Sequence, residues 1–287
     1  GGGTDLLARM LGQEMSERLR QPVVIDNRPG ASTFLGAEAV AKAAPDGYTL
    51  LTSAASTFAI NRALFAKLPY DPIGDFAPIS LLGQFPLLLV VTRDFPPKSV
   101  AEFIASAKSV AKGIDFASAG TGSTHHLAME AFAQRAGIAM VHVPYKGAGP
   151  ALQDLIAGRV PSMFLDMAVA RESMRAGSIR ALAVATAKRL EDAPEVPTVA
   201  ESGFAGFEAS AWNGMVAPRG TPGPIIERLN LTIGQILASP AIRTKMRAAG
   251  IEPAHTSPAE FATYIKAETD RWAEVVRRAN VTAEVPK

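Results

Sequence analysis

The chain lacks cysteine, a long apolar run and a marked excess of charge. With no cysteine among 287 residues, disulfides, a thiol nucleophile and cysteine-ligated zinc or iron–sulfur sites are excluded. The longest apolar run, residues 86–91, is far shorter than the ~20 residues that a membrane-spanning helix needs. Lys and Arg (29) nearly balance Asp and Glu (27), and a net charge of +2 is too small to indicate nucleic acid or a membrane surface as a partner.

Familiar catalytic and nucleotide-binding signatures are also missing. The chain contains no G-x-S-x-G, H-E-x-x-H or G-x-x-x-x-G-K-[ST] motif, and no complete G-x-G-x-x-G. Its four histidines are His125, His126, His142 and His255. His125 and His126 are adjacent at an expected helix start, so their side chains diverge by about 100° and do not easily share a metal ion. The sequence therefore predicts no catalytic residue, no metal site and no cofactor.

What the chain does contain is an alternation of strand-like and helix-like patterns. Runs rich in β-forming residues occur at 23–26, 48–52, 87–92, 114–117, 140–143, 160–165 and 181–185. Helical periodicity is found at 5–20, 33–43, 55–66, 99–111, 123–136, 149–157 and 168–176. This alternation predicts an α/β protein with parallel sheets and right-handed crossovers.

The C-terminal third has a different pattern, which is nearly all helical. Helices are expected at 222–238, 240–249 and 257–279. Ser257, followed by Pro258 and then by Glu260, forms a capping box that predicts where the last helix begins. The apolar face of that helix consists of Phe261, Ile265, Trp272 and Val276.

The N-terminus begins with three glycines that lead into an amphipathic helix. In α/β folds a glycine-rich turn before a helix ordinarily follows a strand. We therefore expect a first strand, and an export signal, ahead of Gly1 in the natural protein. We also expect a gap in the sheet of this chain where that strand would lie.

Two proline-containing joints, at residues 94–98 and 217–222, divide the chain. They predict one domain over residues 97–213 and a second formed by residues 1–96 together with 214–287. Two α/β lobes joined by two such crossings are typical of proteins that hold a ligand in a cleft.

Four loops rich in Gly, Ser and Thr are expected at the carboxyl ends of strands, each leading into a helix. They span residues 1–5, 52–57, 116–124 and 143–150. The free N–H groups and the dipole of a helix N-terminus bind anions without Arg or Lys. Open α/β sheets also place their ligands at this edge. Ordinary helix capping explains any one of these loops, but four of them predict a site for a small anion.

Several longer motifs resemble one known family. Along nearly the whole chain they are, in order, GGGTD, PDGYTL, LPYDP, AGTGSTHHLA, HVPYKGAGP and PEVPTVAESG. Together they resemble the Bug family, the extracytoplasmic solute receptors of tripartite tricarboxylate transporters. The resemblance implies a two-lobed, type II-like periplasmic binding protein, with two α/β domains joined by two crossover segments. It further implies a monomer that delivers a small carboxylate to membrane permease subunits.

The resemblance also implies which residues bind the ligand. In the first lobe they are Gly3, Thr4, Ser53, Ser56 and Thr57. In the second lobe they are Gly120, Thr121, Gly122, Ser123, Thr124, His125, Lys146, Gly147 and Asp166. His125 stands where the family more often has Ser, which would alter specificity. Asp166 lies one place later than the family's acidic residue, so it either contacts the ligand or caps the next helix.

Two other classes of function stay open at this stage. One is an enzyme for a small carboxylated or phosphorylated substrate, with Asp166 or His125 as acid–base, and the other is a ligand-sensing regulatory module. The sequence favours the receptor, because no second polar group partners a candidate nucleophile and no basic recognition helix is present. Lys146 and the helix N-termini favour an anionic ligand, but no cluster of Arg selects among an amino-acid dicarboxylate, a C4-dicarboxylate, a citrate-like acid and an aromatic acid.

Overall fold

The computed structural model describes residues 2–28 and 33–283 of the chain. It divides the chain into two compact units. Unit 1 consists of Gly1–Gln84 and Trp212–Lys287, and unit 2 consists of Phe85–Ala211. In the described residues no helix is both long and apolar enough to cross a membrane.

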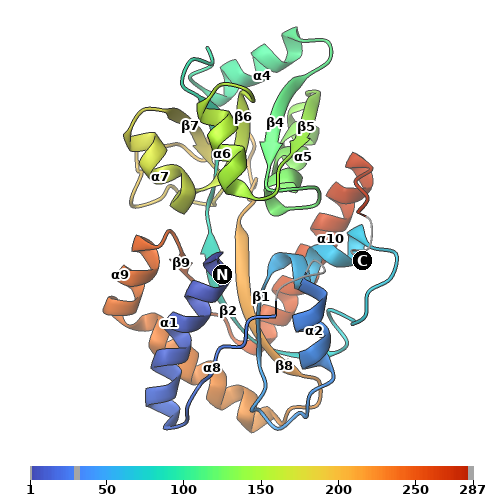
Figure 1. The fold of residues 1–287 in the computed structure, drawn as a ribbon, viewed down its shortest axis with the longest axis vertical. Coiled ribbons are helices and arrows are strands. Elements are labelled where there is room, and N and C mark those ends of the chain that lie inside the picture. The colour runs from blue at the N-terminus through green and yellow to red at the C-terminus, as the bar shows by residue number, and fades with distance from the viewer. Residues whose placement is uncertain (1, 29–32, 284–287) are drawn as a thin grey trace. The chain divides into compact units, whose positions relative to one another are not determined.

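Unit 2 is built on a five-stranded sheet in the order β5-β4-β6-β3-β7 (Figure 1). The strands are β3 (Leu87–Thr92), β4 (Ile114–Ser118), β5 (Met140–Pro144), β6 (Ser162–Asp166) and β7 (Ile179–Val184). Four helices accompany them: α4 (Val100–Ser109), α5 (Thr124–Ala136), α6 (Ala148–Ile156) and α7 (Met167–Arg175). Strand β4 is parallel to both β5 and β6, as the alternating pattern predicts.

Strand β3 corrects two expectations. It is antiparallel to its neighbours β6 and β7, so the sheet is mixed instead of fully parallel. It also belongs to unit 2, so the chain enters that unit between residues 84 and 85, not at the proline joint between 96 and 97. The reason is burial, because all six residues of β3 are buried and an apolar strand of this kind needs a sheet that is covered on both faces. The return to unit 1 lies between 211 and 212, where β8 begins, not between 213 and 214.

Unit 1 contains a four-stranded sheet in the order β1-β8-β2-β9. Its strands are β1 (Leu51–Ala54), β2 (Phe76–Phe85), β8 (Ala211–Pro218) and β9 (Glu252–Pro253). Parallel pairing is wrong here, since β1 runs antiparallel to β8 and β2 runs antiparallel to β9. The strand expected at residues 23–26 is also wrong, because that segment is assigned to no strand.

The helices of unit 1 agree closely with the periodicity. They are α1 (Gly2–Leu19), α2 (Phe34–Ala41), α3 (Asn61–Leu64), α8 (Gly223–Ala238), α9 (Pro240–Ala248) and α10 (Pro258–Ala279), with a π-helical turn, η2 (Ser56–Ile60), before α3. The capping box is confirmed: Glu260 N donates to Ser257 Oγ at 3.2 Å, and Ser257 N donates to the Glu260 carboxylate at 2.8 Å. The four predicted apolar residues of α10 are all buried.

Candidate functional site

Unit 2 brings its predicted site residues to one edge of the sheet. Strands β5, β4 and β6 are adjacent and share one direction, so their carboxyl ends lie together. Strands β4 and β5 lead through short loops into α5 and α6, whereas β6 leads directly into α7. Residues 120–124 and Lys146–Gly147 lie at the first two junctions and Asp166 is the last residue of β6, so three helix N-termini meet at this edge.

The Gly120–Thr124 loop depends on glycine at two positions. Gly120 and Gly122 have φ values of +129° and +75°, in a region that L-residues with side chains rarely adopt. Ser123 caps α5, accepting from His126 N at 3.3 Å. The Ser123 N–H donates to Gly120 O at 3.1 Å. The loop is thus a closed turn at the start of a 13-residue helix.

These hydrogen bonds also determine which backbone N–H groups face a ligand. The amide of Gly122 donates to His126 Nδ1 at 3.0 Å, and the amide of Ser123 is used within the turn. The amides of Thr124 and His125, the first two of α5, have no intrahelical acceptor by the geometry of a helix N-terminus. The backbone N–H groups available to a ligand are therefore those of Thr124 and His125, at the C-terminal end of the loop.

His125, in the first turn of α5, and Asp166, the last residue of β6, are in direct contact. The His125 Nε2 lies 2.8 Å from Asp166 Oδ2, and both side chains are more than four-fifths buried. Because a carboxylate only accepts, the imidazole donates through Nε2. Asp166 occupies the N-cap position of α7, yet its side chain makes no capping bond. The capping alternative for Asp166 is therefore wrong.

The loop between β5 and α6 presents a cation beside a glycine of positive φ. Tyr145 N donates to Ser118 O at 3.1 Å, which joins this loop to the end of β4. Gly147, with φ +113°, is the N-cap residue of α6. Lys146 is exposed, and it makes no ion pair within the described part of the chain. Its ammonium group is therefore available to an anionic ligand.

Three residues next to the Gly120–Thr124 loop were not predicted as site residues: His126, His142 and Ser118. His126 on α5 and His142 on β5 stack with ring centroids 3.6 Å apart and planes 7° apart. His142 Nε2 lies 2.6 Å from Ser118 Oγ, and Ser118 in turn accepts from Gly120 N at 3.0 Å. Burial, followed by the charge of His126, lowers the pKa of His142 to about 4. The sequence contained one signal for His142, which is its place between two valines in an expected strand.

In unit 1, Ser53 and Thr57 belong to a network of hydroxyl groups. Ser53 Oγ and Thr57 Oγ1 are 2.5 Å apart, and Thr57 Oγ1 donates to Thr33 Oγ1 at 2.8 Å. The Thr57 carbonyl accepts from Tyr70 Oη at 2.9 Å, and Thr57 is fully buried. Ser56, in the π-helical turn, is half-buried. The contacts of Thr57 are those of a structural residue.

Thr4 and Ser53 line one cavity in unit 1, which has a volume of about 700 Å³. The cavity runs between the extended residues 24–28 and the residues of and before β1, 48–54. Gly3, the residue before Thr4 in α1, is exposed and does not line the cavity. Thr4 Oγ1 accepts from Asn213 Nδ2 at 2.9 Å, and Asn213 is a buried polar residue of β8 that the sequence did not single out.

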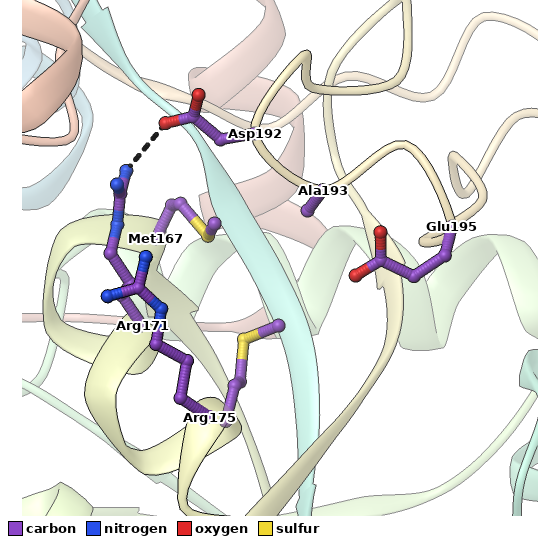
Figure 2. Close-up of a pocket in the computed structure, with 7 residues that line it drawn as sticks. Met167, Arg171, Arg175, Asp192, Ala193 and Glu195 are labelled. Atoms are coloured by element: carbon purple, nitrogen blue, oxygen red, sulfur yellow. Dashed lines mark hydrogen bonds and ion pairs between the residues drawn. The ribbon is translucent and has the colours of Figure 1, made fainter.

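A second cavity, of about 320 Å³, lies in unit 2 between α7 and residues 192–195 (Figure 2). Arg171 and Arg175 of α7 line it together with Asp192 and Glu195. Figure 2 shows Arg171 turned toward Asp192, and the two side chains form an ion pair at 2.8 Å. Because two cations face two carboxylates, this cavity has no net charge to attract an anion. It contains none of the predicted site residues.

Nothing in the described part of the chain resembles a metal centre. No group of three or more His, Asp and Glu side chains in residues 2–28 and 33–283 is arranged to hold a metal ion. The edge of unit 2 is instead suited to a small anion, with helix N-termini, hydroxyl groups and Lys146 as its donors.

Comparison with known families gives a match over nearly the whole chain. Residues 7–281 match the model described as the tripartite tricarboxylate transporter family receptor. The protein BugT of Bordetella pertussis is 40% identical over 278 residues, which cover 96% of this chain and 85% of BugT. A protein of Pseudomonas sp. strain P51 is 38% identical over 277 residues, covering 96% of this chain and 82% of that protein.

Solved structures agree with the sequence relatives. An R. palustris protein solved with adipate has a TM-score of 0.85 at 38% identity, covering 98% of this chain and 94% of its own. MatC from Rhodopseudomonas palustris, with bound malate, has a TM-score of 0.80 at 37% identity, covering 96% and 95%. The periplasmic binding protein BugD has a TM-score of 0.81 at 33% identity, covering 99% and 96%.

Proposed function

Because the chain belongs to the receptor family of the tripartite tricarboxylate transporters, we propose that it is a periplasmic receptor for a small aliphatic dicarboxylate. The observation that carries this proposal is the edge of unit 2, where the N-termini of α5, α6 and α7 lie together and the Gly- and hydroxyl-rich residues 120–124 begin α5. The adipate and malate bound to two relatives support the choice of ligand class.

One carboxylate of the ligand binds at the start of α5. The N–H groups of Thr124 and His125 and the hydroxyl of Ser123 donate to it, while Lys146 supplies a nearby positive charge. Hydrogen bonds to a charged group contribute about 1.5–3 kcal/mol each, and the helix dipole adds ~0.3–1 kcal/mol. Within unit 1, Thr4 and Ser53 remain predicted ligand-binding residues, and both line the large cavity of that unit.

Calorimetric titration with a panel of acids tests the proposal. We expect adipate or malate to bind more tightly than citrate, benzoate or aspartate, each measured at the same pH and salt. A thermal-shift screen provides a second measurement of binding, because a ligand at 100 times its Kd raises the free energy of unfolding by about 2.7 kcal/mol. Absence of binding by every acid in the panel would refute the carboxylate assignment.

The pairing of His125 with Asp166 is our reason for placing aspartate low in this order. An unpaired carboxylate in the site would attract the ammonium group of an amino acid, but Asp166 is hydrogen bonded to an imidazole. We expect His125→Ser to expose the charge of Asp166, to weaken malate binding about tenfold and to strengthen aspartate binding, because like charges a few ångströms apart repel by ~1–4 kcal/mol.

The double variant His125→Ser, Asp166→Asn is the matched control. It removes the imidazole and also the charge that the imidazole covers, so malate affinity should return to within about threefold of the parent. If both variants weaken malate binding equally, the charge of Asp166 does not set selectivity. Calorimetry with malate and aspartate, whose main difference is hydroxyl against ammonium, measures the outcome.

We further propose that the receptor acts without catalysis, as a monomer, and passes its ligand to the permease subunits of the transporter. The match to the receptor family supports delivery to a permease, and two related solved structures are of periplasmic proteins. Incubation of the protein with each acid of the panel, followed by chromatography, should return the acid unchanged. Any product would favour the enzyme alternative, with Asp166 and His125 as the first residues to test.

A further inference from the structure

Two imidazoles pack against the Gly120–Thr124 loop, and neither is among the residues that we propose to bind the ligand. His126 reaches it from α5 and His142 from β5, and the rings lie 3.6 Å apart and nearly parallel. Phe116 of β4 stacks against both, with centroids 5.9 Å from His126 and 5.0 Å from His142. This layered group lies directly beneath the turn that carries the proposed carboxylate donors.

One imidazole is hydrogen bonded to the loop directly, and the other is connected to it through Ser118. His126 Nδ1 accepts from Gly122 N at 3.0 Å, which requires that Nδ1 carries no proton. At the other end, His142 Nε2 and Ser118 Oγ are 2.6 Å apart. The Ser118 hydroxyl then accepts from Gly120 N at 3.0 Å, so the chain of contacts runs from His142 to the backbone of the loop.

The geometry points to His126 and His142 as positioning residues, which hold the Gly120–Thr124 loop in its ligand-binding shape through neutral, stacked imidazoles. The inference rests on the proposed function, since it names what supports the carboxylate donors of that same site. Gly122, with φ +75°, has a strained conformation for most residues, and a bond from its amide to a fixed acceptor selects that conformation.

The same contacts make the loop sensitive to protonation. A proton on His126 Nδ1 would set a donor against the Gly122 N–H, and two cationic rings at stacking distance repel. Among the groups that face the pair, Glu130 Oε1 lies 3.6 Å from His126 Nε2, whereas Phe116 and Ser118 are neutral. The neighbouring His125 is paired with Asp166. A cation below the loop would attract an anionic ligand by charge alone, but we expect the loss of loop shape to outweigh that attraction.

Substitutions that keep or remove the acceptor separate positioning from simple packing. We expect His126→Ala to weaken malate and adipate binding at neutral pH at least tenfold. In His126→Asn an amide oxygen can replace Nδ1, so affinity should recover to within about threefold of the parent. His142→Leu and His142→Gln form the equivalent pair for the bond to Ser118. His255→Ala is the control, since His255 lies in unit 1 beside the Asn230 carbonyl.

A measurement on the ligand-free protein keeps this inference distinct from the proposed function. In NMR spectra of the parent we expect the Gly122 amide to be protected from hydrogen exchange, with the His126 proton on Nε2. Protection should be lost in His126→Ala and restored in His126→Asn, because the amide of Gly122 donates to His126 Nδ1. An unprotected Gly122 amide in the parent, or equal effects of Ala and Asn at position 126, would overturn the inference.

Discussion

Gly122→Val should abolish measurable carboxylate binding, with an expected loss of at least 100-fold in affinity. Gly122 is buried and has φ +75°, where a β-branched residue is strongly disfavoured. The loop must therefore change shape, and the Gly122 N–H leaves His126 Nδ1. Loss of two charge-assisted hydrogen bonds, at about 1.5–3 kcal/mol each, corresponds to this fold-change or more. Titration of the folded variant with malate and adipate measures it.

The other end of the same helix provides a matched control. Gly137 terminates α5 with φ +61°, and a Cβ added there meets nothing within 4 Å. Gly137→Val therefore introduces similar backbone strain without touching the loop. Both valine variants should lose thermal stability, but only Gly122→Val should lose binding. Unchanged affinity in Gly122→Val would show that the loop merely caps the helix.

A smaller effect is expected from Ser123→Ala. This change removes one hydroxyl donor and the bond that Ser123 Oγ accepts from His126 N, whereas the amides of Thr124 and His125 stay in place. Affinity should fall by about tenfold, which is less than for Gly122→Val. The order of the two losses is the informative result, since it ranks backbone donors above the side chain.

The local signals in the sequence were sufficient for most helices and for the loops that follow β4 and β5. Helix α10 begins where Ser257, Pro258 and Glu260 predict, because a capping box is a contact between residues three apart. Strand β2 was missed, since Phe76–Phe85 contains Pro78 and Gly83 and shows no regular alternation. The segment 23–26 has the composition of a strand, yet strand formation also requires a partner distant in sequence.

In the site, too, the sequence predicted features that depend on neighbours in the chain and missed those that depend on residues far apart in it. Gly, Ser and Thr in the loop at 120–124 pointed to anion binding, because their role depends on neighbours in the chain. The stack of His126 on His142 depends on the parallel register that sets Phe116 opposite His142, and no local pattern encodes that register. The pairing of His125 with Asp166, 41 residues apart, likewise depends on the adjacency of β4 and β6.

The largest expected effect on stability concerns a buried carboxylate in unit 1. Glu268 of α10 is 7% exposed, and one of its oxygens accepts from Trp212 Nε1 at 2.9 Å and from Trp272 Nε1 at 3.0 Å. Arg271 forms an ion pair with the same carboxylate at 2.9 Å. The Trp212 ring also packs against Phe58 and Phe261 at the centre of the unit. Glu268 thus satisfies two indole donors within the core.

Glu268→Ala should lower the free energy of unfolding of unit 1 by about 3–5 kcal/mol, because two buried N–H groups and a guanidinium lose their acceptor. Glu268→Gln should lower it by only ~1–2 kcal/mol, since the amide oxygen still accepts from both indoles. Both tryptophans of the chain lie in unit 1, so urea denaturation followed by tryptophan fluorescence reports on that unit alone. Glu274→Ala, which removes an exposed partner of Arg277 and Arg278, should change the value by less than ~1 kcal/mol. Equal losses in the Ala and Gln variants of Glu268 would show that its charge, and not its acceptor role toward the indoles, stabilises the unit.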